Sequence, residues 1–275
     1  MSQVSSKEII KSQQGAVGAF NVILIEHAEA LSEAAVLANA GTILQISENC
    51  VAYHGALKPI ASATKAIIEA SKAPLSLHLD HAERVDLVRE ALDLGFDSVM
   101  YDGSKLSYSE NVATSKKVAD LCRKYGATIE VELGEVGGKD GVHAPGARTN
   151  PSEAKSFVDE TGVDLLAVAV GTSHGQLTRE AELDFELIAE LADTVKIPLV
   201  LHGSSGVSDE SLQQAVKAGM RKVNIATHLN HVFTDEIRAF LHGDPRTVDP
   251  RKYMKQARKA VTTETARLIN LLKLN

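Results

Sequence analysis

The stretch PLVLHGSSG, Pro198–Gly206, contains the pattern that decides the fold. A short apolar run, typical of a strand buried on both faces, leads into a histidine and a turn of glycine and serine. Similar runs rich in valine, isoleucine and leucine recur along the chain. The eight predicted strands are Ala16–Val22, Thr42–Ser47, Leu75–Asp80, Ser98–Asp102, Thr128–Gly134, Leu165–Val170, Pro198–Gly203 and Lys222–Ala226.

Amphipathic segments with helical spacing separate the predicted strands, and clear examples are Glu83–Leu94, Glu110–Tyr125 and Asp209–Ala218. The distance from one strand start to the next fits one strand, one helix and their two loops. Eight such units favour an α/β fold of the closed parallel (β/α)8 type, a TIM barrel, over an open sheet.

No linker or low-complexity segment interrupts this pattern, so we expect a single domain over residues 1–275. An N-terminal helix is expected around Ser5–Gln14, and a C-terminal helical extension is expected from about Asp249. The segment Gly134–Asn150 is long and rich in glycine, as active-site loops often are.

The composition narrows the class of protein. A net charge of −7 and a pI near 5.8 argue against a nucleic-acid partner or an anionic membrane surface. No segment has the roughly 20 apolar residues of a membrane span, and the N-terminus lacks the apolar core of a signal peptide. Cys50 and Cys122 are far apart and are interpreted as core or helix cysteines in a reducing compartment. We therefore expect a cytoplasmic protein.

Polar residues stand where several of the predicted strands end. In a barrel of this type, functional sites lie at the C-terminal ends of the strands. These residues are Asp80 and His81 in the third unit, Asp102 in the fourth, Glu130 and Glu132 in the fifth, His174 in the sixth, His202 in the seventh and Asn224 in the eighth.

His81, His174 and His202 come from three different strand ends and together fit a zinc site. Neutral imidazole is a common zinc ligand, and three such ligands leave a position for water or substrate. Each histidine alone is equally well interpreted as a hydrogen-bonded residue. The matching positions of all three favour the metal.

Other histidines lack this placement. We interpret His78 as packed within the third strand. Five more are interpreted as surface or capping residues: His54, His143, His228, His231 and His242.

Asp80 directly precedes a predicted metal ligand. Alternate side chains of a strand point to opposite faces, so Asp80 can face a substrate while His81 reaches an ion. Proton transfer is the favoured role for Asp80, and the alternative is that it holds a ligand in place.

Two turns follow the last two predicted strands, Gly203–Gly206 and Asn224–Thr227. Barrels often bind phosphate there, through backbone N–H groups and helix N-termini. A glycine- and serine-rich turn alone is more often only a tight loop, but two such turns beside a candidate metal ligand favour a phosphate site. Backbone donors would bind phosphate without any excess of positive side chains.

With these residues and motifs, the sequence resembles a known family, the class II fructose-bisphosphate aldolases, including the tagatose-bisphosphate aldolase branch. The resemblance extends over nearly the whole chain. It is carried by GAFN (Gly18–Asn21), HLDH (His78–His81), SVMYDGS (Ser98–Ser104), ELGEVGG (Glu132–Gly138), VGTSHG (Val170–Gly175), LVLHGSSG (Leu199–Gly206), KVNIATHLN (Lys222–Asn230) and DPRKY (Asp249–Tyr253).

The resemblance implies that Asp80 donates and accepts protons and that His81, His174 and His202 bind one Zn²⁺ ion per subunit. Asp102 and Glu132 are assigned either to support these ligands or to form an alternate metal site. The residues expected to bind the substrate are Asn21, Gly175, Gly203, Ser204, Ser205, Asn224, Ile225, Ala226 and Thr227.

The resemblance also implies a reaction, in which a phosphorylated ketose such as fructose or tagatose 1,6-bisphosphate is cleaved reversibly. The products would be dihydroxyacetone phosphate and an aldehyde such as glyceraldehyde 3-phosphate. Zinc would polarise the C2 carbonyl while Asp80 takes the C4 hydroxyl proton. A monovalent cation such as Na⁺ near the phosphate and a homodimer or homotetramer are further implications.

Three positions depart from the fructose pattern. Asp140 is the nearest match to the carboxylate that would reprotonate the carbanion, where many relatives have glutamate. Ala226 stands where an aspartate commonly contacts sugar hydroxyls, as in the tagatose branch. Gln176–Thr178 replaces a common tyrosine and lysine pair. The reaction class is therefore better specified than the sugar.

Other functions stay open at this stage. A related lyase could act on another ketose phosphate or keto acid phosphate, and a non-catalytic phosphate-binding barrel is a second alternative. A metal-independent aldolase would need a buried lysine at a strand end for a Schiff base, whereas Lys222 is placed at a strand start.

Overall fold

The computed structural model describes residues 3–133, 148–175 and 179–274. Eight strands occur in this described part of the chain. They are β1 (Val17–Asn21), β2 (Thr42–Ser47), β3 (Leu75–Ala82), β4 (Ser98–Tyr101), β5 (Thr128–Leu133), β6 (Leu165–Val168), β7 (Leu199–Leu201) and β8 (Met220–Ile225).

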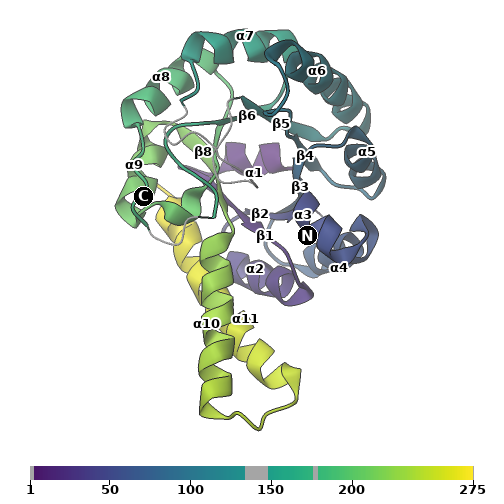
Figure 1. The fold of residues 1–275 in the computed structure, drawn as a ribbon, viewed down its shortest axis with the longest axis vertical. Coiled ribbons are helices and arrows are strands. Elements are labelled where there is room, and N and C mark those ends of the chain that lie inside the picture. Colours follow the sequence, from purple (N-terminus) through teal and green to yellow (C-terminus); the bar gives the residue numbers. More distant parts are fainter. Residues whose placement is uncertain (1–2, 134–147, 176–178, 275) are drawn as a thin grey trace.

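Helices alternate with these strands and form the outer layer (Figure 1). The first six are α1 (Ser6–Ser12), α2 (Ile25–Leu37), α3 (Glu48–His54), α4 (Leu57–Ala70), α5 (Val85–Asp93) and α6 (Tyr108–Tyr125). They are followed by α7 (Pro151–Thr161), α8 (Phe185–Val195), the short 3-10 turn η1 (Ser204–Gly206), α9 (Asp209–Ala218), α10 (Thr227–Gly243) and α11 (Pro250–Leu272).

The strands form a closed parallel barrel in chain order, because β1 pairs with both β2 and β8. This confirms the predicted (β/α)8 barrel. Each observed strand overlaps a predicted one, although β3 continues to Ala82 and β8 starts at Met220, two residues before the predicted start at Lys222.

The interior of the barrel is apolar at one end and polar at the other. A cluster from alternate strand positions, including Val17, Ile43 and Met100, fills the N-terminal end. Ile9 and Ile10 of α1 pack against that cluster, so α1 closes this end of the barrel (Figure 1). Further along the strands, the buried side chains are polar, and these positions lead to the open C-terminal mouth.

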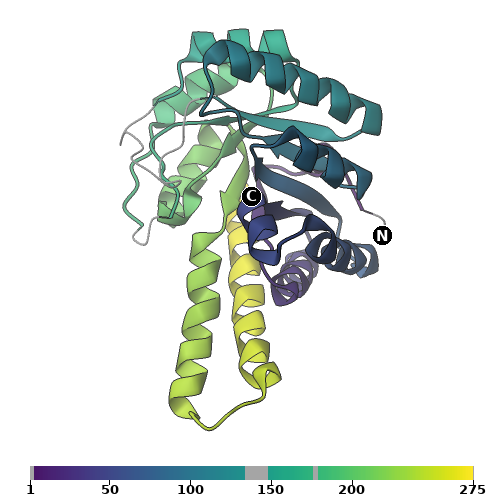
Figure 2. The same ribbon diagram turned by 45° about the vertical axis from the view of Figure 1, so that its right-hand side comes forward.

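A hairpin of two long helices, α10 and α11, projects from the barrel (Figures 1 and 2). The predicted start at Asp249 is confirmed for α11, since the Asp249 side chain caps this helix and Pro250 opens it. The helical extension as a whole starts earlier than predicted, because α10 begins at Thr227, directly after β8.

No helix within the described ranges combines the length and the apolar character that crossing a bilayer requires.

Candidate functional site

The barrel mouth contains a cavity of about 510 Å³. Most of the residues expected to act on a substrate line it. They are Asn21, Asp80, His81, His174, Gly175, Gly203, Ser204, Ser205, Asn224, Ala226 and Thr227. Other walls come from the region after β2 and from Glu83 and Lys105.

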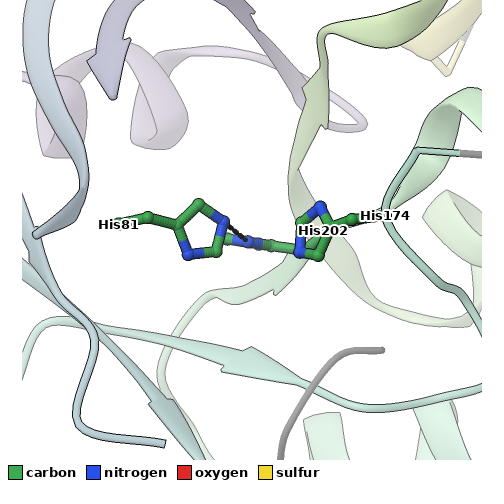
Figure 3. Close-up of side chains that lie close together, drawn as sticks. All are labelled: His81, His174 and His202. Atoms are coloured by element: carbon green, nitrogen blue, oxygen red, sulfur yellow. Dashed lines mark hydrogen bonds between the residues drawn. The ribbon is translucent and has the colours of Figure 1, made fainter. Parts of the chain in front are cut away.

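The three predicted zinc ligands lie close together at this cavity, and Figure 3 shows their rings converging. Potential ligand atoms of His81, His174 and His202 all lie within 4.8 Å of one another. His81 Nε2 and His202 Nδ1 are 2.9 Å apart, and the His81 and His174 ring centroids are 5.0 Å apart. Separate strand ends therefore bring these imidazoles together as expected.

His81 reaches this position through an unusual backbone conformation. Its φ of 49° lies in the left-handed region, and the pairing of β3 with β4 shifts register between Leu79 and Ala82. Such an irregularity re-aims side chains, whereas a regular strand would turn two successive residues to opposite faces. Asp80 and His81 consequently both line the cavity.

Carboxylates determine which ring nitrogen carries the proton in two of the histidines. Asp102 Oδ2 lies 2.8 Å from His81 Nδ1, and Glu130 Oε1 lies 2.9 Å from His202 Nε2. An ionised carboxylate only accepts hydrogen bonds, so each of these nitrogens donates a proton. The nitrogen lone pairs of His81 Nε2 and His202 Nδ1 then face one another.

Two facing lone pairs at 2.9 Å repel unless a cation or a proton lies near both. Neutral imidazoles that donate their other N–H to a carboxylate are the usual protein ligands of zinc. The donor set therefore fits a zinc ion held by His81, His174 and His202. Burial lowers the pKa of His202, which keeps it neutral as a ligand must be.

Asp102 and Glu132 also lie where an alternate metal site was expected. Together with His81 they form a second cluster whose candidate ligand atoms are within 4.8 Å of one another. Asp102 also accepts hydrogen bonds from the Ser104 backbone and hydroxyl. Both acidic residues are buried, so they are placed either to orient His81 or to share a metal with it.

Asp80 is buried beside these histidines, with 3% of its surface exposed. Burial alone would raise the pKa of its carboxyl, but His81, His202 and Lys222 have the opposite effect and the net shift is downward. Asn224 Nδ2 donates to Asp80 Oδ1 at 3.3 Å. Asp80 is therefore an ionised carboxylate able to accept a proton from a molecule in the cavity.

The two predicted phosphate turns are adjacent. Gly203 has a φ of 66°, and a Cβ on it would come within 2.8 Å of the Ser173 backbone, so this tight packing needs glycine. The Ser205 hydroxyl accepts a hydrogen bond from His228 N in the first turn of α10. The η1 turn and the N-terminus of α10 thus form one concave, donor-rich wall.

Some expected residues lie elsewhere. Ile225 is buried in β8 and does not line the cavity, so only its backbone could serve a ligand. Asp140, His143 and Gln176–Thr178 lie outside the described residues.

Among the remaining histidines, the interpretations of His78, His231 and His242 agree with the structure, whereas His54 and His228 are half-buried and hydrogen-bonded to Ile23 O and Glu264, respectively. His78 is buried in β3, hydrogen-bonded to Ser98, and His54 lies in the last turn of α3. His231 and His242 are exposed on α10.

Glu130 and Lys222 are buried below the histidines, and the sequence alone assigned no specific role to either residue. Lys222 Nζ lies 2.7 Å from Glu130 Oε2, and Glu130 in turn contacts His202. The available signal was spacing, since Glu130 and Lys222 each stand two positions before an expected site residue, Glu132 and Asn224. Lys222 is therefore a buried lysine inside the barrel, and not a peripheral residue at a strand start.

Comparisons with known proteins bear on the family and the fold of the chain. The family model described as fructose-bisphosphate aldolase class-II matches residues 5–275. The chain is 26% identical to the YdjI aldolase from Escherichia coli K12, with a TM-score of 0.84 over 98% of this chain and 97% of that one.

Two further solved structures are similar. A putative fructose-1,6-bisphosphate aldolase from Coccidioides immitis is 25% identical, with a TM-score of 0.84 over 97% of this chain and 94% of that chain. The fructose-bisphosphate aldolase of Campylobacter jejuni is 21% identical, with a TM-score of 0.83 over 98% of this chain and 95% of that chain, and this last likeness concerns the fold.

Proposed function

The chain belongs to the class II fructose-bisphosphate aldolase family, and we propose that it cleaves a phosphorylated ketose with the help of zinc. The products would be dihydroxyacetone phosphate and an aldehyde, and the reaction would be reversible. The observation that carries the proposal is the buried Asp80 carboxylate, placed beside three converging imidazoles at the mouth of the barrel.

The metal would be held by His81, His174 and His202. A zinc ion bound there would supply the positive charge that polarises the ketose carbonyl and stabilises the charge developing on C3. Asp102 and Glu130 would keep the proton on the far nitrogen of His81 and His202, respectively.

The C1 phosphate would bind the wall formed by Gly203–Ser205 and Asn224–Thr227. Its donors are backbone N–H groups and the N-terminus of α10, which suits an acidic protein with no cluster of basic residues at this turn. Asn21, at the end of β1, and Gly175 would complete this side of the pocket. A monovalent cation such as Na⁺ would accompany the phosphate.

Asp80 would act on the C4 hydroxyl. Its carboxylate takes the hydroxyl proton, C4 becomes a carbonyl carbon, and the electron pair of the C3–C4 bond stays on C3. A second acid then protonates C3 to complete dihydroxyacetone phosphate. We assign that step to Asp140, which lies outside the described residues.

The aldehyde half of the substrate has two candidates. Fructose or tagatose 1,6-bisphosphate would bring a second phosphate to the outer wall of the cavity. Among the described lining residues, the outer wall offers Ser47, Glu48 and Glu83 with one basic side chain, Lys105, which lies 3.0 Å from Glu83. Acidic side chains outnumber the single lysine on this wall. The second candidate is therefore a ketose or keto acid with a phosphate only at C1.

A substrate panel tests the proposal. Release of dihydroxyacetone phosphate would be followed with a coupled reductase for fructose and tagatose 1,6-bisphosphates and the two 1-phosphates. We expect release from at least one ketose, and release that is slower by about 10²-fold or more from the Asp80→Asn control. Absence of release from all four, with no competing binding of dihydroxyacetone phosphate itself, would contradict the proposal.

A Lys105→Gln variant separates the two candidates. Loss of this cation should raise KM for a bisphosphate about 10-fold or more if Lys105 binds the second phosphate, because such a contact is charge-assisted. The KM for a 1-phosphate should change little. Equal effects on both would show that Lys105 does not read the second phosphate.

The rival functions predict different results. A Schiff-base aldolase would be trapped on a lysine by borohydride in the presence of substrate, and we expect no such adduct. A non-catalytic barrel would bind dihydroxyacetone phosphate without turnover.

The wider setting is also a proposal. We propose that residues 1–275 act as one domain and that the subunits assemble into a homodimer or homotetramer in the cytoplasm. Cys50 and Cys122 are buried free thiols, which supports a reducing compartment. The projecting helices α10 and α11 offer surface for a second subunit (Figure 2).

A further inference from the structure

A buried line of polar side chains runs beneath the candidate metal ligands. It starts at Lys222 Nζ, 2.7 Å from Glu130 Oε2, and continues from Glu130 Oε1 to His202 Nε2 over 2.9 Å. Lys222, Glu130 and His202 are each at most 1% exposed. Lys222 and Glu130 do not line the cavity of the described residues, so a substrate would not touch them.

The barrel geometry explains how these residues meet. Glu130 precedes Glu132 by two positions in β5, and Lys222 precedes Asn224 by two in β8. Residues two apart in a strand point to the same side, so both side chains enter the barrel one level below the mouth. His202 follows β7, between these two strands in space, and its ring reaches down to Glu130.

Stability alone does not account for this ion pair. Removing an ammonium and a carboxylate from water is costly, and apolar side chains of similar volume often serve a protein core equally well or better. Elsewhere in the barrel interior such apolar residues are present, for example Val17, Ile43 and Val200. A charged pair retained at this depth therefore points to a task connected with its third partner, His202.

Glu130 divides its two oxygens between its partners. Oε2 takes Lys222 and lies 3.9 Å from His78 Nε2, whereas Oε1 is left for His202. His78 Nδ1 lies 2.8 Å from Ser98 Oγ, and its Nε2 faces Oε2, the oxygen held by Lys222, at a distance beyond a hydrogen bond. The lysine thereby fixes the carboxylate in the one orientation that accepts the His202 N–H.

We propose that Lys222 and Glu130 are positioning residues that hold His202 in its Nε2–H tautomer, with Nδ1 directed at the metal position shared with His81. Lys222 acts through Glu130, and Glu130 acts through His202. Asp102 has the corresponding place at His81 Nδ1, but its other oxygen is held by Ser104 rather than by a buried cation. The inference rests on the proposed function only in placing a metal at the histidines.

Two variants test this role. Glu130→Leu combined with Lys222→Met replaces the ion pair by apolar side chains and leaves no unpaired charge, so the protein is expected to fold. Glu130→Gln combined with Lys222→Met keeps the shape at position 130 and also leaves no unpaired charge, so it serves if the apolar double variant does not fold. Asp97→Asn is the control, because Asp97 is a half-buried carboxyl that accepts hydrogen bonds from Ser76 and Leu77, directly before β4 and outside the polar line beneath the histidines.

Two readouts are used besides activity. The first is Zn²⁺ affinity, measured by competition with a chromophoric chelator. The second is the tautomer of His202 in metal-free protein, from long-range ¹H–¹⁵N spectra of ¹⁵N-histidine-labelled samples, with His202→Asn to assign the signal. If Lys222 and Glu130 had a purely structural role, zinc affinity and the His202 tautomer would change only in variants that also lose stability.

We expect Zn²⁺ to bind about 10- to 100-fold more weakly in the apolar double variant, and also more weakly in the Glu130→Gln/Lys222→Met variant, as is usual when the partner of a ligand histidine is lost. The His202 signal should change from a single Nε2–H form to a mixture. The Asp97→Asn control should keep both properties.

Unchanged zinc affinity and an unchanged tautomer in a folded variant would overturn the inference, as would equal losses in the Asp97→Asn control. If the wild-type protein itself bound no Zn²⁺, the proposed function would fail. The tautomer of His202 would then still decide the inference by itself.

Discussion

The backbone of His81 is the most constrained feature of the candidate site at the residue scale. A non-glycine residue in the left-handed region costs about 1–3 kcal/mol, and it persists where the surrounding structure enforces it. Here the register shift in β3 and the hydrogen bond to Asp102 enforce it. The result is that two successive residues, Asp80 and His81, both face the cavity.

Asp80→Asn is the most direct test of the proposed base. The amide cannot accept the C4 hydroxyl proton, so kcat should fall about 10²- to 10⁴-fold. The histidines are untouched, so zinc content measured by atomic absorption should match the wild type. Loss of zinc together with retained turnover would contradict the role given to Asp80.

His27 predicts a specific acid sensitivity. It is buried against Phe233 with ring centroids 4.6 Å apart, and burial lowers its pKa to about 4. The ordinary histidine pKa is about 6.5, so below that pH the unfolded chain binds a proton that the folded protein does not. His27 therefore subtracts from stability as the pH falls from about 6.5 toward 4.

The His27→Leu variant removes this term. The free energy of unfolding would be measured by urea titration at pH 7.5 and at pH 4.5. Between these two pH values it should fall by about 2 kcal/mol less in His27→Leu than in the wild type. Phe233→Leu removes the ring contact without removing a titrating group, and it should lower stability similarly at both pH values. Identical pH dependence in wild type and His27→Leu would refute this assignment.

Single residues also mark the limit of what the sequence predicts. The three histidines and Asp80 could be found because each stands at a strand end, which a barrel maps to one face. Lys222 was misjudged because its depth depends on how β8 pairs with β1 and β7, and its partner Glu130 is 92 positions away. Ring tautomers likewise depend on neighbours that only the folded chain supplies.

At the scale of elements, the wall proposed for phosphate depends on two adjacent segments, the η1 turn and the first turn of α10. They are joined through Ser205 and His228. His228 is in turn held by Glu264 of α11, and Arg267 bridges Glu264 to Asp209 at the start of α9. Burial would raise the pKa of Glu264, but hydrogen bonds from Arg267 and His228 outweigh it and lower the pKa to about 2.

Gly203→Ala tests the η1 turn. A methyl group would meet the Ser173 backbone and force both segments apart. We expect KM for the phosphorylated ketose to rise about 10-fold or more, with a loss of stability of about 1–3 kcal/mol from the left-handed alanine and the displaced backbone.

Gly126→Ala provides the matched comparison for this turn. Gly126 has a similar φ of 68° at the end of α6, and a Cβ there would have open space around it. That variant should lose some stability and keep its KM. Equal KM values in the two variants would remove the η1 turn from the phosphate site.

Elements were predicted with uneven success. The eight strands were found because buried parallel strands are continuous apolar runs. The helix α10 was missed because its first residues were assigned to the turn Asn224–Thr227, whereas the helix starts at Thr227, directly after β8. Only Leu229 and Phe233 of this helix are buried, and it projects away from the barrel (Figure 2).

At the scale of the whole molecule, the barrel separates stability from chemistry. The apolar cluster closed by α1 occupies one end of the interior, and the polar residues occupy the other. The net charge of −7 is compatible with an anionic substrate because the proposed phosphate donors are backbone groups. We thus assign the metal, the base and the phosphate wall to the same mouth of the barrel.

Metal dependence is the decisive property of a mouth built in this way. Protein stripped of metal with a chelator and dialysed would be assayed for dihydroxyacetone phosphate release from a mixture of fructose and tagatose bisphosphates and their 1-phosphates, before and after addition of Zn²⁺. We predict that the stripped protein releases no dihydroxyacetone phosphate and that one equivalent of zinc per subunit restores the release. Full activity in the metal-free protein would contradict this prediction.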